Sequence, residues 1–247
     1  RRVGSGRLQP ARRCAAPRAW PQQAVRRCRR AAGHPLQSQA LSCCPPLLPL
    51  NYLAHALLSQ HGSRALLGNI AGDHVKGPLD AQGLHPQLLA GVRRHRAVDV
   101  LSDGHAASCA LRALFPNGER RFAGLLLDVL FDHLLTQHWG RFCSTPPAAF
   151  RAEVYAAIEA HADCLPPGFA ALAPRWVAVD WLGAYARFDG TVAVLERLSA
   201  RARRPLPLPA MLDTAECHWS ALQDGFLALF TDLAAAFADD RRHDLLL

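Results

Sequence analysis

The sequence lacks several features that would narrow its class. Lys76 is the only lysine among the 28 basic residues of this 247-residue chain, and with alanine and leucine abundant this indicates codon bias before any functional demand. No uninterrupted apolar run reaches about 18 residues, so we expect no membrane span. Single cysteines at 109, 143, 164 and 217 form no CxxC pair, which is typical of buried thiols in a reducing compartment. We therefore expect a cytoplasmic protein.

The first fifty residues lack acidic groups altogether. They contain ten arginines, whereas the remaining 197 residues carry 18 basic and 20 acidic groups, a net charge of −2. Their apolar residues follow neither a helical nor a strand period. Such a segment can be a nucleic-acid arm or a transit peptide. We favour translated upstream sequence: residues 1–49 are expected to be an unstructured basic extension, and 50–247 the domain proper, with no nucleic-acid partner.

Strand signals are nearly absent from the main part, and helical signals dominate it. The segment 119–139 is the strongest, with Leu126, Leu127, Leu130, Leu134 and Leu135 on one side. Turn and proline signals separate the other segments. The expected helices cover 51–60, 63–77, 86–103, 105–115, 119–139, 148–161, 166–181, 190–200 and 212–239, with a proline-interrupted loop at 201–209. The sequence predicts an all-α fold, a single bundle of about eight helices.

Polar pairs interrupt the apolar helices at four-residue spacing. Asn51 and His55 share a helix face, as do His95 and Asp99, and Asp128 with Asp132. Most such pairs form solvated faces. Asp128, however, lies in GLLLDVLFDHLL, where a carboxylate would be buried and would need a partner. Imidazole and carboxylate together suit Mn, Fe, Zn or Mg and the hydrolysis that such metals assist.

Two basic residues could bind phosphate beside such a metal. Arg96 follows His95 within an arginine cluster, and a guanidinium can hold two phosphate oxygens. Lys76 follows Asp73 by three residues. An exposed arginine face and chance placement of Lys76 are the alternatives.

Four motifs in order resemble the acyl carrier protein phosphodiesterase family. They are NYLAH (51–55), LLGNIAGDHVKG (66–77), GVRRHRAVDVLSDGH (91–105) and RRFAGLLLDVLFDHLLTQHW (120–139), and the segment 181–208 is similar to the C-terminal half of that family. The resemblance implies a helical fold like that of HD-domain metal phosphohydrolases. It implies removal of 4′-phosphopantetheine from holo-acyl carrier protein with a divalent cation, Mn²⁺ or alternatively Mg²⁺. The essential aspartate of the family's GN-x-x-x-D segment falls on Asp73.

These observations assign provisional roles. The cation is expected on His55, Asp73, His95 and Asp128, of which Asp73, His95 and Asp128 are also the expected catalytic residues. Asn51, Asp99, Asp132 and His133 are expected to orient ligands or to hold a second metal, and Arg96 and Lys76 to bind phosphate. His133 or His105 could protonate the leaving oxygen. Because carrier proteins are acidic, a basic rim is expected from Arg93, Arg94, Arg120, Arg121 and the 201–204 loop. A phosphohydrolase of small nucleotide phosphoesters and a silent binding module remain alternatives.

Overall fold

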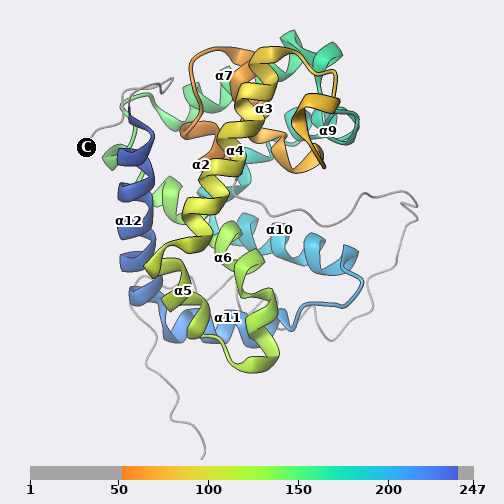
Figure 1. The fold of residues 1–247 in the computed structure, drawn as a ribbon. Coiled ribbons are helices and arrows are strands. Elements are labelled where there is room, and N and C mark those ends of the chain that lie inside the picture. Colours follow the sequence, from red (N-terminus) through yellow and green to blue (C-terminus); the bar gives the residue numbers. More distant parts are fainter. Residues whose placement is uncertain (1–51, 239–247) are drawn as a thin grey trace, which may run out of the picture.

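The computed structural model describes residues 52–238, and every regular element in that range is helical (Figure 1). The predicted all-α fold is therefore confirmed. The α-helices are α2 (Tyr52–Leu57), α3 (Ser63–Ile70), α4 (Pro86–Gly104), α5 (Ala106–Ala113), α6 (Asn117–Gln137), α7 (Pro147–Ala160), α8 (Pro167–Ala170), α9 (Ala173–Ala178), α10 (Phe188–Arg201), α11 (Leu208–Cys217) and α12 (Trp219–Ala236). Short 3₁₀ turns are η1 (Gly72–His74), η2 (Leu79–Ala81), η3 (Trp139–Arg141), η4 (Ala162–Cys164) and η5 (Leu182–Ala186). Asn51 and the expected extension at 1–49 lie outside the described residues.

The described helices are more numerous than the sequence predicts, and some of them are shorter. The segment 166–181 forms two helices, because Pro174 starts α9 with its missing N–H in the first turn. Pro209 likewise lies in the first turn of α11, which begins inside the predicted loop. The expected closing helix is interrupted at His218, between α11 and α12. None of the described helices has the length and apolar character needed to cross a membrane.

Helix α6 occupies the middle of the bundle (Figure 1). It contacts α2, α5, α10, α11 and α12. All five leucines predicted on its apolar side are buried in the main hydrophobic core. Because α6 has neighbours on several sides, polar residues on it are also enclosed, and this brings Asp132 and His133 into the interior.

Helices α3 and α4 cross with their backbones in direct contact. A Cβ on Gly68 would lie 2.0 Å from the carbonyl oxygen of Leu88, and one on Gly91 would lie 2.0 Å from that of Ala65. Only glycine permits so close a crossing. The crossing brings the end of α3 against the middle of α4.

The turn after α3 lies on a small apolar cluster of its own. Val75, Leu88 and Val92 form this second cluster, which fixes η1 on α4. Gly72 at the start of η1 lies against the His95 ring, so close that an added Cβ would be 2.2 Å from Cγ of His95. The segment carrying Asp73 is thus placed beside His95.

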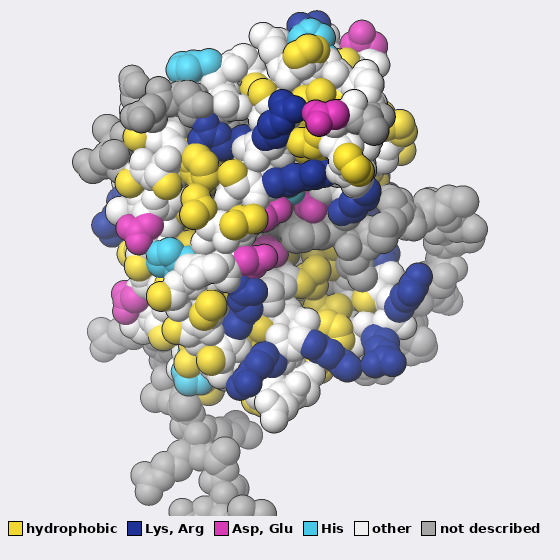
Figure 2. Space-filling model, in the orientation of Figure 1, with side chains coloured by type: hydrophobic (Ala, Val, Ile, Leu, Met, Phe, Trp, Pro, Cys, Tyr) yellow, Lys and Arg dark blue, Asp and Glu magenta, His cyan; other side chains and the backbone are white. Residues whose placement is uncertain are grey.

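One face of the molecule combines both charges. Figure 2 shows acidic side chains (magenta) near the middle of this face, with Lys and Arg side chains (dark blue) above and below them.

Candidate metal centre

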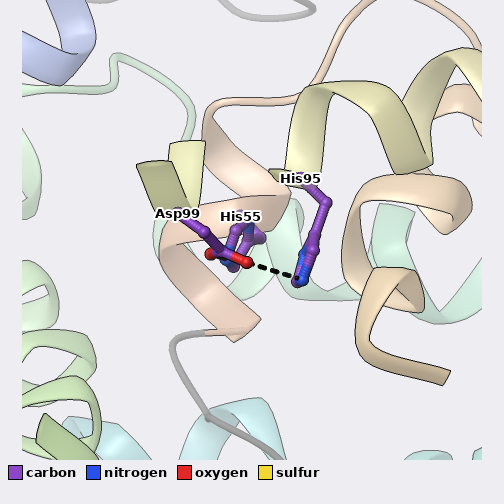
Figure 3. A group of neighbouring side chains, drawn as sticks. All are labelled: His55, His95 and Asp99. Atoms are coloured by element: carbon purple, nitrogen blue, oxygen red, sulfur yellow. Dashed lines mark ion pairs between the residues drawn. The ribbon is translucent and has the colours of Figure 1, made fainter. Parts of the chain in front are cut away.

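Three side chains from α2 and α4 converge on one point (Figure 3). His55, His95 and Asp99 each offer a ligand atom, and these atoms lie within 4.8 Å of one another. Nε2 of His55 is 3.2 Å from Oδ1 of Asp99, and Nε2 of His95 is 3.2 Å from its Oδ2. The two imidazole rings stack with their centroids 4.1 Å apart. Both histidines are buried, whereas the Asp99 side chain is 38% exposed, so the group opens to solvent on the Asp99 side.

Asp73 borders the same group. Its Oδ1 lies 3.6 Å from Nε2 of His95, and its side chain is only 10% exposed. The structure therefore brings together three of the four expected metal ligands, His55, Asp73 and His95. It adds Asp99, which the sequence suggested only for an orienting or second-metal role.

Asn69 connects both histidines and was missed by the sequence reasoning. Its Oδ1 lies 2.9 Å from Nδ1 of His55, and its backbone carbonyl lies 2.8 Å from Nδ1 of His95. Its amide nitrogen donates to the His55 carbonyl at 2.7 Å and to Ser59 Oγ at 3.2 Å. The available signal was the asparagine inside LLGNIAGDHVKG, a polar residue within the apolar stretch 65–71.

The charges of the group depend strongly on one another. Burial and the neighbouring His95 lower the pKa of His55, which favours a neutral ring. Burial also opposes charge on His95, but the contacts with Asp73 and Asp99 outweigh it and raise the pKa of His95 to about 9. Asp99 is partly desolvated, yet the two imidazoles lower the pKa of its carboxyl well below the usual range.

The donor set fits a divalent transition metal. Each Nδ1 has an acceptor, whereas neither buried Nε2 makes a hydrogen bond of good geometry to any described residue. Both Nε2 atoms face the same carboxylate. Two imidazoles with one or two carboxylates suit Mn, Fe or Zn better than Mg²⁺, which prefers an oxygen shell.

Asp132 and His133 lie on α6 and bind the backbone. The Asp132 carboxylate accepts hydrogen bonds from the N–H groups of Leu53 and Ala54, both at 3.0 Å. It thus caps the first turn of α2, the helix that carries His55. Nδ1 of His133 lies 2.8 Å from the carbonyl oxygen of Tyr185 and ties α6 to η5. Neither side chain is part of the convergent group.

Asp128 also lies outside the group of three. Burial, reinforced by the nearby Asp103 and Asp99, raises the pKa of Asp128 to about 7. Asp103 itself accepts from Arg112 of α5 at 3.0 Å. Asp128 is therefore a half-buried carboxyl close to other acidic groups, and its expected role as a metal ligand stays a prediction.

The basic residues near the group differ in their burial and in their hydrogen bonds. Arg96 donates to the carbonyl oxygens of Val75 and Gly77, at 3.1 and 2.9 Å, and so holds the segment that follows Asp73. Lys76 is exposed on that segment. Arg94 is buried with its guanidinium over the Phe237 ring, so it cannot belong to the expected docking rim.

Elsewhere in the described part of the chain, an apolar cavity of about 390 Å³ separates α7 from α8 and α9. Its lining includes Ile158, Leu165 and Val177, and Glu159 is its only charged residue. The cavity is otherwise lined by apolar side chains.

Comparison with known proteins decides the family. The family model for acyl carrier protein phosphodiesterase matches residues 50–233, about three quarters of the chain. The chain belongs to the acyl carrier protein phosphodiesterase family. The match includes every residue of the convergent group and the whole bundle from α2 through most of α12.

Relatives within this family are similar over most of their length. A Yersinia pestis protein named acyl carrier protein phosphodiesterase is 31% identical over 73% of this chain and 94% of its own length. Relatives of the same name from Photorhabdus laumondii and Serratia proteamaculans are 33% and 32% identical, over 69% and 74% of this chain and 86% and 95% of their own lengths. No solved structure matches, so the expected likeness to HD-domain enzymes stays a prediction.

Proposed function

We propose that the chain hydrolyses the phosphodiester that joins 4′-phosphopantetheine to the serine of holo-acyl carrier protein. Its place in the acyl carrier protein phosphodiesterase family supports the substrate. The convergence of His55, His95 and Asp99 beside Asp73 supports the chemistry and is the observation that carries the proposal.

The proposed cofactor is a divalent cation, Mn²⁺ rather than Mg²⁺. His55 and His95 would hold it through their Nε2 atoms and Asp99 through its carboxylate, with Asp73 as a further ligand. Two nitrogen donors favour Mn²⁺ over the harder Mg²⁺. When bound, the cation supplies charge for the phosphate oxygens and makes a water more acidic.

The chain's own residues then organise the hydrolysis. Asp73, whose carboxylate lies beside the imidazole of His95, would accept a proton from the attacking water. The water oxygen bonds to phosphorus as the bond from phosphorus to the serine oxygen breaks, and the serine oxygen takes up a proton from solvent. Arg96 and Lys76 remain the proposed phosphate ligands. Arg96 on α4 is hydrogen-bonded to Val75 and Gly77, the residues on either side of Lys76, so the two basic residues lie on neighbouring segments.

The protein substrate needs a docking surface around this site. Basic side chains flank the acidic middle of the face in Figure 2, which suits an acidic carrier protein. The proposed rim comprises Arg93, Arg120, Arg121 and the arginines of the 201–204 loop, all exposed. A cytoplasmic location is proposed with it, because all four described cysteines are free thiols.

The proposal is tested by the mass of holo-acyl carrier protein after incubation with the enzyme, with Mn²⁺ and without. We expect loss of the phosphopantetheine mass only with the cation. Asp99→Asn should slow the release at least about 100-fold, because it removes a ligand carboxylate. Asp103→Asn, four residues further along α4 and paired with Arg112, is the matched control and should retain most of the activity.

Two results would count against the proposal. Equal activity of Asp99→Asn and wild type, with helicity unchanged in both, would remove the site. Hydrolysis of small nucleotide phosphodiesters without release from holo-acyl carrier protein would support the alternative substrate class.

A further inference from the structure

Each histidine of the metal centre faces Asn69 through its Nδ1 and Asp99 through its Nε2. A neutral imidazole carries one proton, and the nitrogen without it is the one that can bind a metal. The partner of Nδ1 therefore decides whether Nε2 is available.

The orientation of the Asn69 amide follows from its partners. The backbone carbonyl oxygen of His55 can only accept, so the Asn69 atom 2.7 Å from it is the NH₂ group. Ser59 Oγ donates to the same carbonyl at 2.8 Å and accepts the second amide hydrogen at 3.2 Å. With its nitrogen held there, Asn69 must turn Oδ1 toward Nδ1 of His55.

The tautomer of His55 follows in turn. Oδ1 of Asn69 can only accept, so Nδ1 of His55 must carry the proton across the 2.9 Å contact. With the proton on Nε2 instead, two buried lone pairs would face each other, which is unfavourable. The lone pair of Nε2 then faces the Asp99 carboxylate at 3.2 Å. Both groups are acceptors, and a cation between them would bind both.

The backbone of Asn69 fixes a proton on the imidazole of His95. The Asn69 carbonyl oxygen, 2.8 Å from Nδ1 of His95, can only accept, so this Nδ1 also carries a proton. One residue thus orients both imidazoles, with its side chain for one and its backbone for the other.

We propose that Asn69 is a positioning residue that fixes His55 as the Nδ1–H tautomer and thereby keeps Nε2 free for a metal ion. Its consequence for a cation rests on the proposed function, whereas the tautomer follows from the hydrogen bonds alone. In Asn69→Ala, His55 loses its acceptor while Asp99 still lies beside Nε2, so the proton should move to Nε2. The bond of His95 to the backbone should survive.

Long-range ¹H–¹⁵N NMR of the metal-free protein at neutral pH tests the tautomer. We expect Nδ1–H for His55 in wild type and in Ser59→Ala, the matched control, which keeps the bonds from Asn69 to His55. In Asn69→Ala we expect Nε2–H. A wild-type His55 protonated on Nε2 would overturn the proposal, and this spectrum alone decides the tautomer if Asn69→Ala does not fold.

Titration with Mn²⁺ alone tests the consequence. Asn69→Ala should weaken Mn²⁺ binding about 10- to 100-fold, as the loss of an orienting partner does at other metal sites, and Ser59→Ala should leave it nearly unchanged. Unchanged tautomer and affinity in a folded Asn69→Ala protein would refute the role of Asn69. If wild type shows the expected tautomer but binds no Mn²⁺, the proposed function fails and the tautomer assignment stands.

Discussion

Two carboxyl groups one turn apart on α6 have opposite surroundings. Asp132 is fully buried but accepts two backbone N–H bonds that would otherwise lack partners at the start of α2. Asp128 has no such donors among the described residues, and the charges of Asp103 and Asp99 oppose its ionisation. Burial raises the pKa of both carboxyl groups, but the two N–H donors oppose this rise at Asp132, whereas neighbouring carboxylates add to it at Asp128.

We predict that Asp128→Asn stabilises the metal-free protein at pH 8. Burial raises the pKa of Asp128 from its ordinary 3.8 to about 7, so its stabilising contribution is complete below pH 3.8 and is lost as the pH rises through 7. Asparagine stays neutral, and the gain at pH 8 should be about 1–4 kcal/mol, vanishing near pH 4. Urea unfolding with EDTA at both pH values measures it.

Asp80→Asn is the control for this prediction. Asp80 is almost fully exposed and is not among the charges that shift the pKa of Asp128, so its replacement should bring no comparable gain at pH 8. A free energy of unfolding of Asp128→Asn that parallels wild type at every pH would show that Asp128 is not desolvated.

The residue types at the site were predictable from the sequence, whereas the groups that each side chain contacts were not. The four-residue spacing placed His95 with Asp99 on one face of α4, and the structure confirms that pairing. The partner of a buried carboxylate depends on tertiary packing, however. Asp128 and Asp132 share a face of α6, yet only the bundle determines that Asp132 meets the start of α2.

At the scale of elements, the metal centre depends on the crossing of α3 and α4. Helix α3 carries Asn69, and α4 carries His95 and Asp99. Gly68 and Gly91 allow the two backbones to touch, and η1 brings Asp73 in from the turn that follows α3. A change in the distance between the helices would therefore alter the site without changing any ligand.

We predict that Gly91→Ala weakens both the fold and the metal centre. The new Cβ would lie 2.0 Å from the Ala65 carbonyl oxygen and 2.8 Å from the Asn69 nitrogen, both backbone atoms that cannot turn aside. The helices must separate, at a cost of about 1–3 kcal/mol. Urea unfolding and Mn²⁺ titration should both detect the change.

Gly124→Ala in α6 serves as the matched control. Nothing lies within 4 Å of a Cβ at Gly124. Alanine in an open helical position should stabilise the protein by roughly 0.5–1 kcal/mol. If Gly91→Ala behaved like Gly124→Ala, the close crossing of α3 and α4 would be wrong.

Helix content was predictable from period and proline signals, whereas helix ends were less so. The periodic segment 119–139 corresponds to α6, and Pro86 starts α4 as expected. The break at His218 has no proline or glycine to mark it, so periodicity alone extended one helix through it. In the glycine-rich stretch 68–77, Gly68 and Gly72 allow close packing against α4.

At the scale of the whole molecule, the net charge is close to balanced although the charges are unevenly distributed over the surface. Residues 51–247 carry 18 basic and 20 acidic groups and are almost balanced. Basic groups nonetheless flank the acidic middle of one face (Figure 2). A charged rim around a site speeds the approach of a partner more than it strengthens the final complex. Salt weakens this long-range attraction. The docking of an acidic protein should therefore depend on ionic strength.

We predict that replacing Arg201, Arg203 and Arg204 with alanine raises the KM for holo-acyl carrier protein about tenfold at low salt, since exposed ion pairs contribute about 0.5 kcal/mol each. The kcat should change little, because these exposed side chains lie outside the metal centre. The difference should disappear near 0.5 M salt, where the Debye length falls to about 4 Å. Arg141→Ala, an exposed arginine outside the proposed rim, is the control. A salt-independent rise in KM, or an equal rise in the control, would exclude the loop from docking.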